Sequence, residues 1–180
     1  MYARLPGFHL STGGREASEA LGKALRSAPL AALCSSPLER AVETAEALAR
    51  PRGLTVVRDD RLLEWSFWAR WQGLPWSRVR ERDPQLLEVY GRDPAAASPE
   101  HPLEAAGRAV LAWAEETEGR FAEGSVIGVT HEAPLLAALM LGSGRDLSGY
   151  HSLNLPHLGA VRLRPGPAEV VDLLQWARAC

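Results

Sequence analysis

The clearest pattern along the chain is a short apolar run that passes directly into a helical pattern. Residues 125–129 are almost all apolar and few in number, which predicts a strand buried on both faces. In the helical pattern that follows, Pro134 fits a first turn and Gly142 stands where a helix would end. The sequence therefore predicts a buried strand followed at once by a helix, with Thr130 and His131 at the junction.

The rest of the chain alternates between strand and helix patterns. Helices are predicted from Ser11 or Thr12 to Pro29, from Ser36 to about Arg50, and over 102–118. Short strands are predicted over 30–35, 54–58, 157–163 and 169–174, the last two joined by a turn at 165–167. Within 76–100, residues 76–83 have a weak helical pattern, Pro84 interrupts it, and 93–99 is loop-like. No repeat or linker divides the 180 residues, so a single α/β domain is predicted.

One polar candidate follows the strand predicted over 30–35. Ser36, Pro37 and Glu39 predict a helix start, with serine as the cap and glutamate closing a capping box. Arg40 then lies in the first turn, from which it could reach an anion at the carboxyl edge of the strand. The alternative is a solvated arginine paired with Glu39 or Glu43, and the residues alone favour that alternative.

A second candidate, Glu64, follows the strand predicted over 54–58 and precedes an aromatic segment at 65–76. Its tryptophans could form a stripe on one helical face, whereas Gly73 and Pro75 favour a folded loop over the sheet. An aromatic wall would desolvate the Glu64 carboxyl group and raise its pKa, which suits a general acid. The alternative is a glutamate in a surface loop.

The third candidate is His131. Ligands of open α/β sheets bind at the carboxyl ends of the strands, and a helix N-terminus there favours an anion. Because His131 stands between a predicted strand and a predicted helix, it is predicted to contact a bound phosphate. The alternative is a histidine that only caps the helix.

Composition excludes several classes of function. A formal net charge of −2 gives no support for nucleic-acid binding. Neither a membrane span nor a signal peptide is visible, and Cys34 and Cys180 have no metal-ligand spacing, so we expect a cytoplasmic protein with reduced thiols. Nucleotide-binding loops, zinc motifs and the serine-nucleophile elbow are missing. An arginine, a glutamate and a histidine remain, each after a predicted strand, and together they suit phosphoryl chemistry.

Three motifs in order resemble the histidine phosphatase superfamily, whose fold is that of the phosphoglycerate mutases. The segment 36–45 resembles its second signature, 63–73 its acid loop, and 126–131 the strand that carries its second histidine. Residues 7–16 also resemble the approach to its first helix. The resemblance implies a three-layer α/β sandwich with a mostly parallel central sheet and helices on both faces.

The resemblance also implies chemistry through a phosphohistidine, without metal or other cofactor. Arg40 would bind the phosphoryl group, Glu64 would donate the proton, His131 would hold the phosphate, and His9 and Phe67 would lie near the substrate. The expected partner is a small phosphorylated substrate or inorganic phosphate, with residues 76–100 as a cap over the site. The oligomeric state is left open, a homodimer included.

The chain departs from the family at its front. The family opens on a central strand that ends in Arg-His-Gly and supplies the nucleophilic histidine, and nothing here matches it. That strand would lie between 125–130 and 157–163, so its loss would expose a sheet edge with unpaired backbone groups. We therefore expect either a natural start upstream of Met1 or a missing first segment, and little or no phosphatase activity from these residues. The alternatives are a non-catalytic phosphate-binding protein of the same fold, and a structural module in which Arg40, Glu64 and His131 do not converge.

Overall fold

A parallel three-stranded sheet forms the centre of the computed structural model, which describes residues 1–121, 123–164 and 166–179. Its strands are β1 (Leu30–Ser35), β2 (Val56–Arg58) and β3 (Ser125–Val129), in the order β2-β1-β3. A separate antiparallel pair follows, β4 (Ala160–Arg162) with β5 (Glu169–Val171). All three strands of the central sheet point the same way, so their carboxyl ends meet at one edge.

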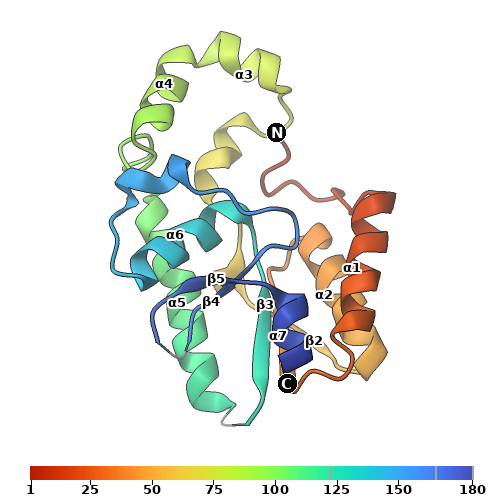
Figure 1. Ribbon diagram of the computed structural model, residues 1–180. Coiled ribbons are helices and arrows are strands. Elements are labelled where there is room, and N and C mark those ends of the chain that lie inside the picture. The colour runs from red at the N-terminus through yellow and green to blue at the C-terminus, as the bar shows by residue number, and fades with distance from the viewer. Residues whose placement is uncertain (122, 165, 180) are drawn as a thin grey trace.

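Helices cover both faces of this sheet (Figure 1). On one face, α1 (Thr12–Ala24), α2 (Glu39–Ala49) and α7 (Leu173–Ala179) pack on a cluster that includes Leu33 and Ile127. On the other, α5 (Leu103–Arg120) and α6 (Glu132–Gly142) pack over Cys34 and Val126. Neighbouring residues of one strand thus face opposite layers, as the two-residue period of a strand requires. The predicted α/β sandwich is confirmed.

The aromatic segment folds over one end of the molecule as a compact loop. Residues Ser66–Trp71 form a 3-10 helix, and Gly73 takes a left-handed backbone conformation with φ of 80°. Trp65, Phe67 and Trp71 are at most 1% exposed. The helical-stripe and folded-loop interpretations are therefore each correct in part, since Trp68 contacts both Trp65 and Trp71 along the 3-10 helix and the chain turns at Gly73. Trp65 and Trp71 are core residues, whereas Trp76 is 45% exposed. Further 3-10 turns span Arg50–Arg52, Asp60–Leu62 and Leu147–Ser152.

Two glycines let large elements approach closely. A Cβ atom on Gly107 of α5 would lie 2.8 Å from the backbone of Ala137 in α6, so these helices touch through their backbones. On β3, a Cβ atom on Gly128 would overlap the ring of Trp113. Gly128 is the register partner of Cys34, whose free thiol is buried in the same cluster. Both contacts involve α5, which packs against α6 through Gly107 and against β3 through Trp113.

Several local predictions need correction. Leu38 occupies the N-cap position of α2 without a side-chain cap bond, so Ser36 forms no capping box. The helix predicted over 76–83 is present as α3 (Trp76–Arg82) and ends before Pro84 as predicted, but Pro84 then opens a further helix, α4 (Pro84–Arg92), because proline fits a first helical turn. The predicted strand over 169–174 ends at Val171, and α7 begins at Leu173. Strands β2 and β4 are also shorter than predicted, and α1 ends at Ala24 before the predicted limit at Pro29. In contrast, β1, α5, β3 and α6 agree closely with their predictions. Pro165 of the predicted turn, and Cys180, lie outside the described residues.

The central sheet has an open side. Within the described ranges, β3 pairs only with β1 and β4 pairs only with β5, so the far edge of β3 has no strand partner. This agrees with the exposed edge predicted between 125–130 and 157–163. In the same ranges, no helix combines the length and the apolar character that a bilayer crossing requires.

Candidate functional site

His131 lies at the carboxyl edge of the sheet, between β3 and α6. It occupies the N-cap position of α6, yet its side chain makes no capping bond and is buried, with the residue 8% exposed. Instead, Nε2 lies 2.8 Å from Ser36 Oγ and Nδ1 lies 3.2 Å from Nη2 of Arg40. The capping alternative is wrong, because the imidazole joins two residues that follow β1.

These two contacts identify the protonation state of the ring. A guanidinium can only donate, so Nδ1 of His131 accepts from Arg40 and the ring proton is on Nε2, directed at Ser36. Burial, together with the charges of Arg40 and Arg4, lowers the pKa of His131 to about 3. His131 is therefore a neutral imidazole near pH 7.

Arg40 projects from the first turn of α2 into the same space. Its Nη2 also donates to the carbonyl of Ala3 at 2.9 Å, and the ring of Tyr2 lies 4.9 Å from the guanidinium carbon. The Nη1 atom is buried and has no hydrogen-bond partner within the described residues. The alternative of a solvated arginine paired with Glu39 or Glu43 is wrong, since those carboxylates bind the backbone N–H groups of Gly7 and Leu10 instead.

Glu64 reaches the site from the loop that follows β2. Thr130 fixes this loop, because its hydroxyl donates to the carbonyl of Leu62 at 2.8 Å. Glu64 Oε1 accepts from the N–H of Trp65 at 2.8 Å, and Oε2 lies 4.0 Å from Nδ1 of His131. Burial raises the pKa of Glu64 to about 7. Since His131 is neutral, this proximity is not an ion pair.

Arg4 is a charged residue of the site that the sequence analysis missed. Its Nε donates to the carbonyl of Glu64 at 2.8 Å, and its Nη2 donates to the same oxygen. Burial lowers the pKa of Arg4, while the charge of Glu64 raises it. The segment around Arg4 has neither a periodic pattern nor a motif, so the only signal was its position before residues 7–16. Ser36 was also missed, because it had been assigned a capping role.

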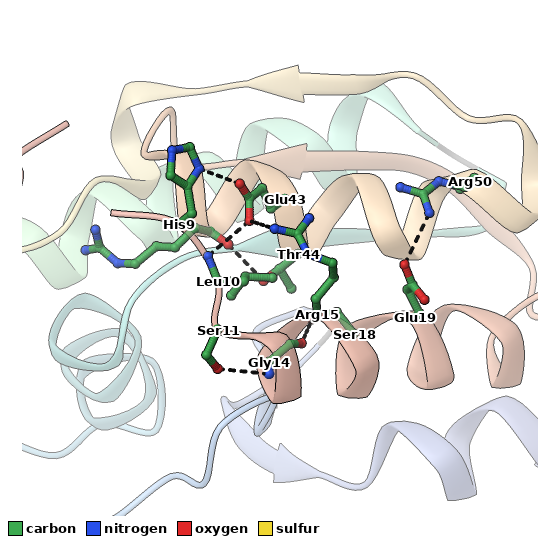
Figure 2. Close-up of polar contacts among 11 residues, drawn as sticks. His9, Leu10, Ser11, Gly14, Arg15, Ser18, Glu19, Glu43, Thr44 and Arg50 are labelled. Atoms are coloured by element: carbon green, nitrogen blue, oxygen red, sulfur yellow. Dashed lines mark hydrogen bonds and ion pairs between the residues drawn. The ribbon is translucent and has the colours of Figure 1, made fainter. Parts of the chain in front are cut away.

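His9 and Phe67 make other contacts. His9 Nδ1 is 2.5 Å from Glu43 Oε1, and Arg15 binds the other oxygen of the same carboxylate (Figure 2). His9 also lines a surface groove with Arg4 and Arg58, with a volume of about 380 Å³. Phe67 is fully buried and stacks on Trp65 with ring centroids 4.5 Å apart. In the described part of the chain, neither residue hydrogen-bonds to Arg40, Glu64 or His131.

The converging groups form a site with an excess of positive charge. Arg40 contacts the neutral imidazole of His131, and Arg4 contacts the carbonyl of Glu64. The carboxyl group of Glu64 is protonated below about pH 7, because burial and, to a smaller extent, the charge of Glu132 raise its pKa. No described group of three histidine, cysteine or acidic residues could hold a metal ion. Such an arrangement can bind a tetrahedral oxyanion and supply one proton to it.

Sequence comparison places the chain among known proteins. A family model of the histidine phosphatase superfamily (branch 1) matches residues 2–176. A bifunctional protein of Mycobacterium tuberculosis is 40% identical over 94 residues, which are 52% of this chain and only 25% of that protein. Phosphoserine phosphatase 1 of Hydrogenobacter thermophilus is 28% identical over 151 residues, covering 79% of this chain and 68% of the relative.

Solved structures agree on the fold. YhfR of Bacillus stearothermophilus superimposes with a TM-score of 0.81 at 23% identity, covering 96% of this chain and 91% of that one. A mycobacterial glucosyl-3-phosphoglycerate phosphatase gives a TM-score of 0.79 at 20% identity, covering 94% and 88%. With the family match extending over nearly all of its residues, the chain belongs to branch 1 of the histidine phosphatase superfamily.

Proposed function

We propose that this site binds the phosphoryl group of a small phosphomonoester for hydrolysis through a phosphohistidine. We propose also that the nucleophilic histidine is absent from these 180 residues, so that they alone have little or no phosphatase activity. In the complete reaction, a histidine nitrogen attacks phosphorus and the ester P–O bond breaks. Glu64 gives its proton to the leaving oxygen, and water then cleaves the P–N bond and returns a proton to Glu64.

The observation that carries this proposal is the unpartnered Nη1 of Arg40. A buried guanidinium nitrogen without an acceptor costs free energy, so it implies a ligand that supplies one. Nη2 of the same residue contacts Nδ1 of His131, which supports a binding position for the ligand beside the imidazole. The raised pKa of Glu64 supports the proton-donor role, because a carboxyl group that ionises near neutral pH can both give and regain a proton.

Two further observations support the absence of the nucleophile. None of the other four histidines hydrogen-bonds to Arg40, Glu64 or His131 in the described part of the chain. The open edge of β3 lies at the strand whose carboxyl end carries His131, where an additional strand would bring a further side chain to the site. A non-catalytic phosphate-binding protein is the second candidate, favoured by the complete anion-binding set without a free imidazole nucleophile.

Calorimetric titration with inorganic phosphate and an assay with p-nitrophenyl phosphate test the proposal. The 180-residue chain should bind phosphate, Arg40→Ala should lose at least tenfold in affinity, and turnover should be near background. Arg26→Ala is the matched control, because it removes an exposed arginine that precedes β1, at the opposite end of the strands.

A version that includes any in-frame codons before Met1 separates the two candidates. Turnover that appears in this version and is lost in His131→Ala supports the phosphatase. Phosphate binding without turnover in either version supports the binding protein. Phosphate binding that is absent, or unchanged in Arg40→Ala, would overturn both candidates.

A further inference from the structure

Arg4 is a partly desolvated cation without a carboxylate partner. Most arginines that this structure pairs with an acid lie on the surface, including Arg78 with Glu81 and Arg92 with Glu88. Within the described residues, by contrast, no carboxylate oxygen lies within 4.0 Å of a side-chain nitrogen of Arg4 or Arg40. Arg4 contacts the carbonyl of Glu64, and Arg40 contacts His131, whose ring lies 4.0 Å from the Glu64 carboxyl group. Both guanidiniums therefore lie at the same group of residues, where charge-assisted hydrogen bonds from each can reach one anion.

The local geometry fixes Arg4 against the acid loop. Its Nε and Nη2 both donate to the carbonyl of Glu64, so the guanidinium lies in a defined orientation beside that residue. Its Nη1 has no hydrogen-bond partner within the described residues and remains available to a ligand. The preceding carbonyl, that of Ala3, accepts from Nη2 of Arg40. Residues 3 and 4 therefore connect the loop of Glu64 with the first turn of α2.

We infer that Arg4 is a second phosphate-binding residue, which shares the anion with Arg40 and so favours the dianion of a phosphomonoester. This inference rests on the proposed function and assigns one more residue to the same site. Arg4 acts on the same groups as Arg40, because its charge influences the protonation of both Glu64 and His131. Each guanidinium can pair with one oxygen of a phosphate dianion.

Calorimetric titration with inorganic phosphate at about pH 8, where the phosphate dianion predominates, tests the inference with three variants of one residue. Arg4→Gln retains an N–H donor for the Glu64 carbonyl without the charge, Arg4→Lys retains the charge, and Arg4→Ala removes both. We expect at least a tenfold loss of phosphate affinity in Arg4→Gln and Arg4→Ala, and a smaller loss in Arg4→Lys. Arg26→Ala should leave the affinity unchanged, and thermal unfolding identifies any variant that has lost its fold.

The outcomes separate a failure of the inference about Arg4 from a failure of the proposed function. If Arg4→Gln binds phosphate as tightly as the unmodified chain while Arg40→Ala does not, Arg4 only holds the loop and the inference is wrong. If the affinity is the same in Arg40→Ala as well, the proposed function fails together with it. A folded Arg4→Gln with weakened binding, beside an unchanged Arg26→Ala, supports the inference.

Discussion

Nη2 of Arg40 lies 3.2 Å from Nδ1 of His131, and this contact joins a residue after β1 to a residue after β3. Because the guanidinium donates, the imidazole is neutral and its proton is directed at Ser36. The site thus contains a histidine that accepts from a cation on one side and donates to a hydroxyl on the other. This arrangement leaves the positive charge on the arginines, where an anion can use it.

Ser36 should control the orientation of His131. In Ser36→Ala the Nε2 proton loses its buried acceptor, so we expect the free energy of unfolding to fall by about 1–3 kcal/mol and phosphate affinity to fall with it. Ser35→Ala is the control, since Ser35 is equally buried but its hydroxyl donates to the backbone carbonyl of residue 36. Nitrogen NMR of His131 should show the Nε2–H form in the unmodified chain and in Ser35→Ala. A mixed tautomer in the unmodified chain would contradict this assignment.

Glu64 should make stability depend on pH. Its pKa is raised from 4.5 to about 7 in the folded state, so its contribution is complete below about pH 4.5 and is lost as the pH rises through 7. The shift corresponds to at most about 3 kcal/mol. Glu64→Gln removes this dependence, so it should be more stable than the unmodified chain at pH 8 and lose that advantage at pH 5. Urea unfolding at both pH values measures this, and an advantage that does not change with pH would count against a raised pKa.

Gly107 should be far more sensitive to substitution than Gly119, although both lie in α5. Gly107→Ala places a methyl group against the backbone of Ala137, so we expect a loss of about 1–3 kcal/mol in the free energy of unfolding. Nothing lies within 4 Å of a Cβ atom on Gly119, so Gly119→Ala should stabilise the chain by up to about 1 kcal/mol through helix propensity. Thermal unfolding of the two variants compares them directly, and equal effects would refute backbone contact between α5 and α6.

Asp83 should anchor the helical pair α3–α4 to the aromatic core. Its Oδ2 accepts from the indole N–H of Trp71 at 2.6 Å, and Trp71 is fully buried. Asp83→Ala leaves that N–H unpaired and should cost about 1–3 kcal/mol, whereas Asp83→Asn keeps an acceptor and should cost less. Hydrogen exchange should show faster opening of residues 76–92 in Asp83→Ala only. Unchanged exchange there would mean that other contacts hold the pair.

The strands and helices that surround the site could be predicted from sequence because their patterns are local. A buried apolar run followed by Pro134 and ended near Gly142 identified β3 and α6, and Ser11 identified the start of α1. The pattern failed where tertiary contacts override local preference. Ser36 has the ideal context for a helix cap, yet its hydroxyl binds His131, which is distant in sequence.

The charged residues of the site show the same limit. Sequence alone favoured Arg40 as a solvated residue, because two glutamates lie within a helical turn of it. In the fold, those glutamates bind the backbone of residues 7 and 10, and the arginine turns inward instead. Arg4 could not be found at all, since only the folded chain brings it to the carbonyl of Glu64.

The position of Cys34 also has a practical consequence. Its thiol is buried on β1 beside Gly128 and Trp113, and burial raises its pKa, so little thiolate is available to a reagent in solution. Alkylation at this residue, followed by peptide mass spectrometry, therefore requires the sheet and α5 to separate. The rate of alkylation therefore reports how often the sheet that carries His131 opens locally. A bound ligand that stabilises this part of the fold would lower the alkylation rate.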